Sequence, residues 1–181
     1  MSTTTLMNVE QFAQLPDDER GKYELVEGEL VPVSSPTPRH NIIRQKIAFL
    51  LQKLLQKGGL GGFLVETDVR LDERTVRRPD VVCLTETKWQ AIDRLRIPVS
   101  ITPDLAIEVL SQADAIMDFN HKVNEYLRAG IAEVWLVYPE DREVHVRRGK
   151  AVQVLQAGDT LESPVLLPGF SVKIAEIFEE L

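Results

Sequence analysis

Apolar residues recur with a helical period in parts of this chain, and these parts predict its helices. The clearest helical pattern covers residues 41–57, where the spacing of apolar residues is three or four and Gly58-Gly59 ends the run. A second helix is predicted over residues 118–129, ending before Gly130. Shorter helices are predicted over residues 8–20, with Asn8 as the N-cap, and at the C-terminus.

Other segments alternate between apolar and polar residues, or are almost entirely apolar, and these predict strands. Alternation predicts β-hairpins over residues 23–33 and 143–156, and an antiparallel pair of strands over 63–71 and 76–84. The nearly continuous apolar runs at 104–110 and around A-E-V-W-L-V-Y are typical of buried central strands. A polar connection that is partly helical is expected between residues 85 and 103.

The order of these elements predicts an α/β fold, with a mixed β-sheet flanked by helices and added β-hairpins. The chain contains no repeat and no low-complexity tract, and nothing in it indicates a second domain, so we expect one domain over residues 1–181. A length of 181 residues suffices for a substantial hydrophobic core.

Composition and charge limit the cellular compartments and the kinds of partner to be considered for the protein. No apolar run approaches the roughly 18 residues that a membrane span needs, and the N-terminus lacks a secretory signal pattern. The single cysteine, Cys83, sits in a strand pattern that indicates core packing and fits the reducing cytoplasm. The net charge of −7 argues against a surface uniformly charged for nucleic acid, although it leaves room for a local basic patch.

Two acidic residues stand inside apolar strand segments, where ionised groups are rare unless they are paired or hold a metal ion. Asp80 lies in R-R-P-D-V-V-C-L and Glu108 lies in P-D-L-A-I-E-V-L-S. Strand alternation places Asp104 on the same face as Glu108, but at roughly 13 Å along the strand, which is too far for one ion to bind both carboxylates. A metal partner of Glu108 must therefore come from another strand, and Asp80 is the candidate.

The predicted helix at 118–129 contributes a third charged group. Lys122 flanks the apolar stripe of this helix and can direct its ammonium group toward the sheet, whereas His121 projects about 100° away and is interpreted as a surface residue. Two acids and a lysine beside a sheet suit phosphodiester hydrolysis, in which the acids hold Mg²⁺ and the lysine orients water or stabilises negative charge. A purely structural alternative stays open, in which Asp80 caps a turn and Glu108 forms a buried ion pair with Lys122.

Several segments together resemble the Uma family of restriction-endonuclease-like proteins, within the PD-(D/E)XK nuclease superfamily. The segments are Y-E-L-V-E-G-E-L, P-R-H, R-P-D-V-V, P-D-L-A-I-E-V-L-S and K-V-N-E-Y-L-R-A-G-I-A-E-V-W-L-V, which occur in this order between Tyr23 and Val146. The resemblance implies a restriction-endonuclease-like fold and a Mg²⁺- or Mn²⁺-dependent endonuclease acting on DNA. It places the motif aspartate at Asp80 and the motif acid at Glu108, and it implies a homodimer.

The chain departs from the superfamily pattern in one position. The pattern has a lysine two residues after the motif acid, and this chain has Leu110 there. The resemblance then requires the lysine to come from the following helix, where Lys122 is the candidate. The departure also supports an alternative function, that of a catalytically inactive nuclease-fold protein with a nucleic-acid-binding or regulatory role.

Three further residues belong to the segments that resemble the family. Glu24 either extends the metal site or faces solvent, and His40 either contacts a phosphate or metal-bound water or caps the first long helix. Ser111 either lines the site or caps the next turn, and the turn is the favoured interpretation.

Overall fold

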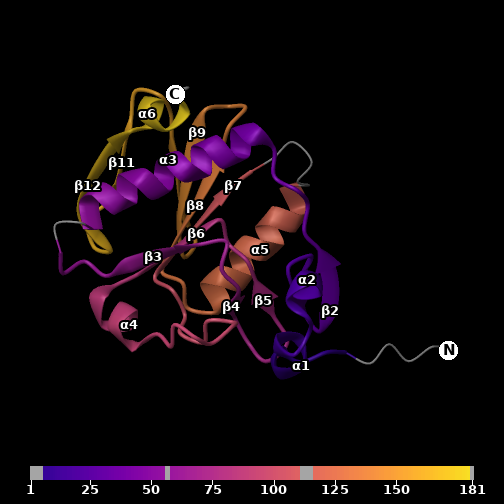
Figure 1. The fold of residues 1–181 in the computed structure, drawn as a ribbon. Helices are drawn as coiled ribbons and strands as arrows, with labels where there is room; N and C mark the ends of the chain where they lie inside the picture. The colour runs from indigo at the N-terminus through magenta and orange to yellow at the C-terminus, as the bar shows by residue number, and fades with distance from the viewer. Residues whose placement is uncertain (1–5, 56–57, 111–115, 180–181) are drawn as a thin grey trace.

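A six-stranded mixed sheet forms the centre of the protein (Figure 1). The structure, a computed structural model, describes residues 6–55, 58–110 and 116–179. The strand order is β10-β9-β8-β7-β6-β3, in which β7 and β8 are parallel and the other neighbours are antiparallel. The strands are β3 (Gly62–Val65), β6 (Val81–Leu84), β7 (Leu105–Val109), β8 (Glu133–Tyr138), β9 (Glu143–Arg148) and β10 (Ala151–Leu155).

Helices cover both faces of this sheet, as the predicted α/β architecture requires. Helix α5 (Ile116–Arg128) connects the parallel strands β7 and β8 and lies on one face, and helix α3 (Pro38–Leu55) crosses the other (Figure 1). On the α3 side, a two-stranded sheet of β11 (Thr160–Ser163) and β12 (Leu167–Lys173) and the short helix α6 (Ile174–Phe178) complete the layer. Of the described residues, no helix is both long and apolar enough to cross a membrane.

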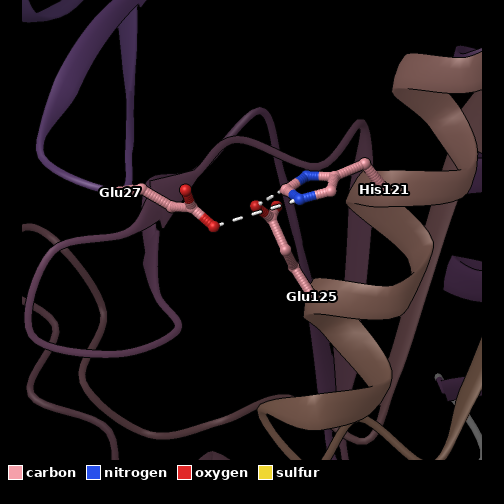
Figure 2. A group of neighbouring side chains, drawn as sticks. All are labelled: Glu27, His121 and Glu125. Atoms are coloured by element: carbon pink, nitrogen blue, oxygen red, sulfur yellow. Dashed lines mark ion pairs between the residues drawn. The ribbon is translucent and has the colours of Figure 1, made fainter.

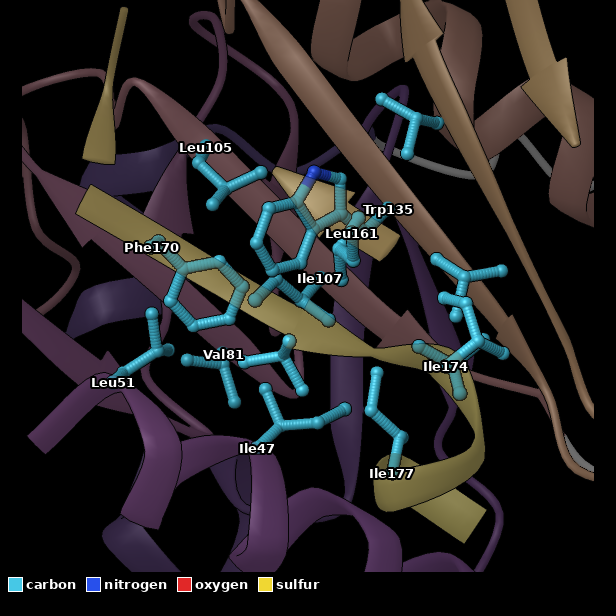
Figure 3. Close-up of a cluster of buried hydrophobic side chains, with 14 of the residues drawn as sticks. Ile47, Leu51, Val81, Leu105, Ile107, Trp135, Leu161, Phe170, Ile174 and Ile177 are labelled. Carbon is cyan, nitrogen blue, oxygen red and sulfur yellow. The ribbon is translucent and has the colours of Figure 1, made fainter. Parts of the chain in front are cut away.

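Alternation along β7 divides its side chains between two cores. Leu105 and Ile107 are fully buried against α3, α6 and β12, in the cluster that Figure 3 shows. Ala106 and Leu110 belong to the second core, which includes Val123 of α5. All five residues of β7 are buried, which explains why this strand is almost continuously apolar in the sequence.

A second, smaller sheet lies beside the large one, with strand order β2-β1-β5-β4. Its strands are β1 (Tyr23–Val26), β2 (Glu29–Pro32), β4 (Val69–Arg70) and β5 (Val76–Arg77). The hairpin predicted at residues 23–33 is therefore confirmed. The N-terminal helix α1 (Val9–Ala13) packs on this sheet through Phe12, which is fully buried with Leu25 and Val76.

The predicted strands at 63–71 and 76–84 are each broken in two, and this is a correction to the sequence analysis. The first is divided at Glu66, whose φ of 45° turns the chain, so that β3 joins the large sheet and β4 the small one. The second is divided by Arg78, Pro79 and Asp80, and Pro79 has no N–H group with which to continue a ladder. Both breaks lie at the junction of the two sheets, so Asp80 lies where the chain enters the large sheet.

Other predicted elements are confirmed with adjusted limits. The helix expected at 8–20 consists of α1, capped by Asn8, and a separate turn of helix, α2 (Asp17–Arg20), that begins after Pro16. The connection from 85 to 103 contains α4 (Glu86–Ala91), and β9 and β10 form the hairpin that turns at Gly149. The end of the first long helix at residues 56 and 57 lies outside the described residues. The β11–β12 pair was not anticipated.

Two glycines with nearly the same positive φ allow a controlled test of the packing between β3 and β6. Gly61 has φ 94° and Gly130 has φ 96°. A Cβ atom at Gly61 would lie 2.0 Å from the Leu84 carbonyl oxygen, whereas one at Gly130 would meet no atom of the described residues within 4 Å. We expect Gly130→Ala to lower the free energy of unfolding by about 1 kcal/mol through its positive φ, and Gly61→Ala to lower it by roughly 2 kcal/mol more. Urea unfolding followed by circular dichroism measures both values, and equal losses would contradict this account of the packing.

Candidate active site

The two acidic residues predicted from the sequence lie side by side where β6 and β7 pair. Val81 pairs with Ile107 in the antiparallel register, so Asp80 faces Glu108 at the next position. Both residues are buried, with exposed fractions of 8% for Asp80 and 4% for Glu108. The period-two argument that rejected Asp104 and selected Asp80 thus agrees with the structure. The Asp104 carboxylate instead accepts hydrogen bonds from Lys88 and Thr85.

Asp80 is held by contacts from two other elements. Its Oδ2 accepts a hydrogen bond of 2.7 Å from the backbone N–H of Val109 in β7, and its Oδ1 lies 2.7 Å from Nε2 of His40 in α3. Arg44, one turn further along α3, places a guanidinium nitrogen 3.7 Å from the same Oδ1. Asp80 is therefore oriented by a strand and a helix that are distant from it in sequence.

Glu108 is bound by two groups of helix α5. Its Oε1 lies 2.9 Å from the Lys122 Nζ and accepts a short hydrogen bond of 2.5 Å from the Tyr126 hydroxyl. Lys122 and Tyr126 are four residues apart, so they project from the same face of the helix. Both of these contacts use Oε1.

Glu24 of β1 adds a third carboxylate to the site. Its Oε1 lies 3.3 Å from the Lys122 Nζ and accepts a hydrogen bond of 2.7 Å from the Arg78 backbone N–H. Its Oε2 accepts one of 2.8 Å from Arg77, whose Nε donates to Glu125 of α5 at 2.7 Å. A continuous chain of buried charges therefore joins Glu108, through Lys122, Glu24 and Arg77, to Glu125.

Burial and crowding of charge determine how these groups titrate. Burial, helped by the neighbouring Asp80 charge, raises the pKa of Glu108 to about 7, against the opposing effects of Lys122 and Tyr126. Burial also acts to lower the pKa of Lys122, but the carboxylates of Glu108 and Glu24 outweigh it and raise that pKa above its ordinary value. One ammonium group is shared between two carboxylates, so it stays charged but leaves Glu108 incompletely neutralised.

These groups line one cavity of about 630 Å³, and all five site residues predicted from the sequence belong to its wall. They are Glu24, His40, Asp80, Glu108 and Lys122. Hairpin β1–β2 forms one side of the cavity and helix α5 another, through residues such as Val31 and Phe119. The cavity is large enough for a sugar-phosphate unit of a polymeric substrate.

The residues at this junction fit a divalent cation. Two carboxylates from adjacent strands meet at the cavity wall, and the charge of Asp80 raises the pKa of Glu108. A cation between them would relieve that repulsion, and an all-oxygen pair of ligands suits Mg²⁺ or Mn²⁺.

Sequence reasoning missed part of this arrangement. Tyr126 is not among the predicted site residues, because its spacing fits the apolar stripe of the helix predicted at 118–129; its position four residues after Lys122 was the signal that both side chains reach the same acid. Arg77 gave no local signal, because its partners Glu24 and Glu125 are 53 and 48 residues away. Ser111 lies outside the described residues.

Leu110 occupies the position where the superfamily pattern has a lysine, and its environment explains the departure. It is 9% exposed and belongs to the apolar cluster beneath α5 that includes Val123. The position is thus used for core packing, and the ammonium group that contacts Glu108 comes from the helix above it.

Comparisons with known proteins identify first the class and then the family. The fold matches that of a crystal structure described as a "putative nuclease belonging to DUF820" from Anabaena variabilis ATCC 29413. The TM-score is 0.82, the identity is 18%, and the match covers 95% of this chain and 97% of that one. The chain belongs to the Uma2 family, described as "Putative restriction endonuclease", whose model matches residues 9–175. It is also 27% identical over 131 residues to an uncharacterised protein of Synechocystis sp. (strain ATCC 27184 / PCC 6803 / Kazusa), covering 70% of this chain and 71% of that protein. The predicted family and fold are confirmed.

The raised pKa of Glu108 predicts a specific dependence of stability on pH. The native carboxyl group, with a pKa of about 7 against an ordinary value of 4.5, retains its proton where the unfolded chain has lost it, so stability falls as pH rises from 5 to 8. Glu108→Gln removes this group. We expect the free energy of unfolding of the variant, relative to wild type, to increase by about 2–3 kcal/mol over that range.

Urea unfolding at pH 5, 6, 7 and 8 with a chelator present measures this difference. The matched control is Asp104→Asn: hydrogen bonds from Lys88 and Thr85 outweigh burial and lower the pKa of Asp104, so its carboxylate is ionised in both states over the whole range. Its difference from wild type should stay constant. A difference for Glu108→Gln that does not change with pH would show that Lys122 keeps Glu108 ionised.

Proposed function

We propose that the protein is a metal-dependent endonuclease that hydrolyses phosphodiester bonds of DNA. The observation that carries the proposal is the convergence of Asp80 and Glu108 at one cavity wall, with the Lys122 ammonium 2.9 Å from Glu108. Membership of a family described as "Putative restriction endonuclease" supports the reaction class. The roles of the individual residues are part of the proposal.

Asp80 and Glu108 would hold a Mg²⁺ or Mn²⁺ ion. Such an ion, when bound, polarises a phosphoryl oxygen and lowers the pKa of bound water. The chain's own contribution is to hold both carboxylates in place, through the Val109 N–H and His40 on Asp80 and through Tyr126 on Glu108. Carboxylates that are already oriented need little rearrangement when a substrate arrives.

Lys122 would stabilise negative charge that develops on the phosphoryl group, or orient the attacking water. Its raised pKa keeps the ammonium group charged at neutral pH. The contact of 3.3 Å with Glu24 gives this ammonium a second anchor, so its position at the cavity wall does not depend on Glu108 alone. His40, whose Nε2 lies 2.7 Å from Asp80 Oδ1, is on the α3 side of the cavity, where it can contact a phosphate group or a metal-bound water.

A second candidate function is that of a catalytically inactive nuclease-fold protein that binds nucleic acid or regulates a partner. Leu110 in the motif lysine position and the net charge of −7 favour it. In that case the Glu108–Lys122 contact is a buried structural ion pair and nothing more.

DNA cleavage in the presence of Mg²⁺ or Mn²⁺ tests the proposal. We expect wild-type protein to nick or linearise plasmid DNA only when the metal is present. Asp80→Asn, Glu108→Gln and Lys122→Met should each lower the rate by about a hundredfold or more, because each removes a group that acts on the transition state. Gel electrophoresis over a time course provides the rates.

Asp104→Asn is the matched control, since Asp104 is an acid at the other end of the same strand segment and hydrogen-bonds to Lys88 away from the cavity. It should cleave at the wild-type rate. Absence of cleavage by wild type, together with DNA binding that weakens steeply with salt, would support the inactive alternative. Equal activity in wild type and the Asp80 and Glu108 variants would assign any cleavage to a contaminant.

A further inference from the structure

Three side chains outside the catalytic junction converge where the β1–β2 turn meets helix α5. Glu27 lies in the turn, and His121 and Glu125 are one helical turn apart on α5 (Figure 2). The His121 Nε2 lies 4.0 Å from Glu27 Oε1, and the His121 Nδ1 lies 3.2 Å from Glu125 Oε1. One ligand atom from each of the three residues lies within 4.8 Å of the other two. The sequence analysis treated His121 as a surface residue, and it is indeed about half exposed, but its ring faces these two carboxylates.

Glu125 gives independent evidence that these three side chains bind a cation. The residue is only 7% exposed, and its Oε2 accepts a hydrogen bond from Arg77. Its Oε1 is shielded from solvent and accepts no hydrogen bond from the described part of the chain. A buried carboxylate oxygen without such a partner is costly, so the arrangement favours a cation at that oxygen.

The chemistry of the donors selects the ion. An imidazole nitrogen with two carboxylate oxygens is a ligand set of first-row divalent ions such as Zn²⁺, whereas Mg²⁺ prefers oxygen ligands alone. Around one Zn²⁺ at bond lengths of about 2.1 Å, ligand atoms are about 3.4 Å apart, and the three ligand atoms here, one from each residue, all lie within 4.8 Å of one another. Two ligands four residues apart on one helix and a third from a facing turn also match the way such sites are assembled.

We propose that Glu27, His121 and Glu125 form a Zn²⁺-binding site, separate from the catalytic junction, with water completing the coordination. Two of its ligands come from α5 and one from the β1–β2 turn, and these elements form two walls of the cavity. Zinc would therefore fasten the hairpin to the helix that carries Lys122. Arg77, which bridges Glu125 and Glu24, links the site to the charges around Lys122. The inference does not depend on the endonuclease proposal, because it concerns other ligands and another ion.

Calorimetric titration of metal-free protein with Zn²⁺ tests the site, with the bound metal counted after gel filtration. We expect one Zn²⁺ per chain that His121→Ala and Glu27→Gln bind at least about tenfold more weakly, because each loses a ligand. Glu27 is 72% exposed at its side chain, so the Gln substitution leaves the fold intact and keeps the test valid if His121→Ala unfolds. Co²⁺ in place of Zn²⁺ should give a visible absorption spectrum that disappears in the same variants.

Two controls separate this site from other histidine and acid pairs in the chain. His145→Ala removes a histidine that lies 3.1 Å from a single glutamate, Glu143, and it should bind Zn²⁺ as wild type does. Asp80→Asn with His40→Ala removes one of the two carboxylates of the catalytic junction and the histidine that contacts it, and this variant should also retain the Zn²⁺. Loss of the ion in this last variant, or retention at wild-type affinity in both His121→Ala and Glu27→Gln, would overturn the proposal. Cleavage assays do not enter this test, so its failure is distinct from a failure of the endonuclease proposal.

Discussion

The buried contact between Glu108 and Lys122 is the interaction on which the arrangement of the candidate site depends. It joins the central strand β7 to the helix that follows it in the chain, and it lies at the wall of the cavity. Removing two charges from water is expensive, and a pair of apolar residues would generally serve stability as well or better. The pair is therefore poorly explained by stability alone. Its neighbours Asp80 and Glu24 add further buried negative charge, so the whole arrangement costs still more desolvation, which a chemical role would account for.

The same contact shows how the two sheets are coupled. The Lys122 ammonium bridges Glu108 of the large sheet and Glu24 of the small one. Arg77, in the small sheet, contacts Glu24 of the same sheet and Glu125 of helix α5, so it links the small sheet to that helix. Each cation contacts two acids, and Glu108 and Glu24 each have more than one donor, so removing any member leaves an uncompensated charge in a buried place. These contacts hold the junction in one geometry.

The sequence predicted local features, such as the faces of a strand, better than it predicted contacts between distant segments. The two-residue period of a strand correctly assigned the side chains of residues 104–110 to two faces. Leu105, Ile107 and Val109 lie in one core and Ala106 and Leu110 in the other. Asp80 was chosen as the partner of Glu108 because Asp104 is too far along the same strand, and the register of β6 against β7, which the sequence did not predict, places Asp80 opposite Glu108. The homodimer implied by the family resemblance stays a prediction.

The sequence pattern did not predict contacts between segments that are far apart in the chain. The division of the strand at 76–84 depends on Pro79 and on the two sheets competing for the same segment, which alternation alone cannot show. The contacts of Arg77, and the turn that brings Glu27 to His121, arise from the packing of the small sheet against α5. Both features come from tertiary packing, whereas helix phasing within α5 was sufficient to direct Lys122 toward the sheet.

The position of the lysine has a consequence for how the site is maintained. Had the ammonium group come from residue 110, the strand alone would have fixed its distance from Glu108. Leu110 instead fills the core beneath α5, and Lys122 reaches Glu108 only if the helix stays seated on that core through Val123 and Tyr126. Tyr126 acts in both capacities, because its ring is fully buried in the core and its hydroxyl group donates to Glu108. The positions of Asp80 and Glu108 are fixed by the sheet, whereas the position of the Lys122 ammonium group is fixed by the packing of α5. Any ligand that fastens α5 to the β1–β2 hairpin therefore also restrains Lys122.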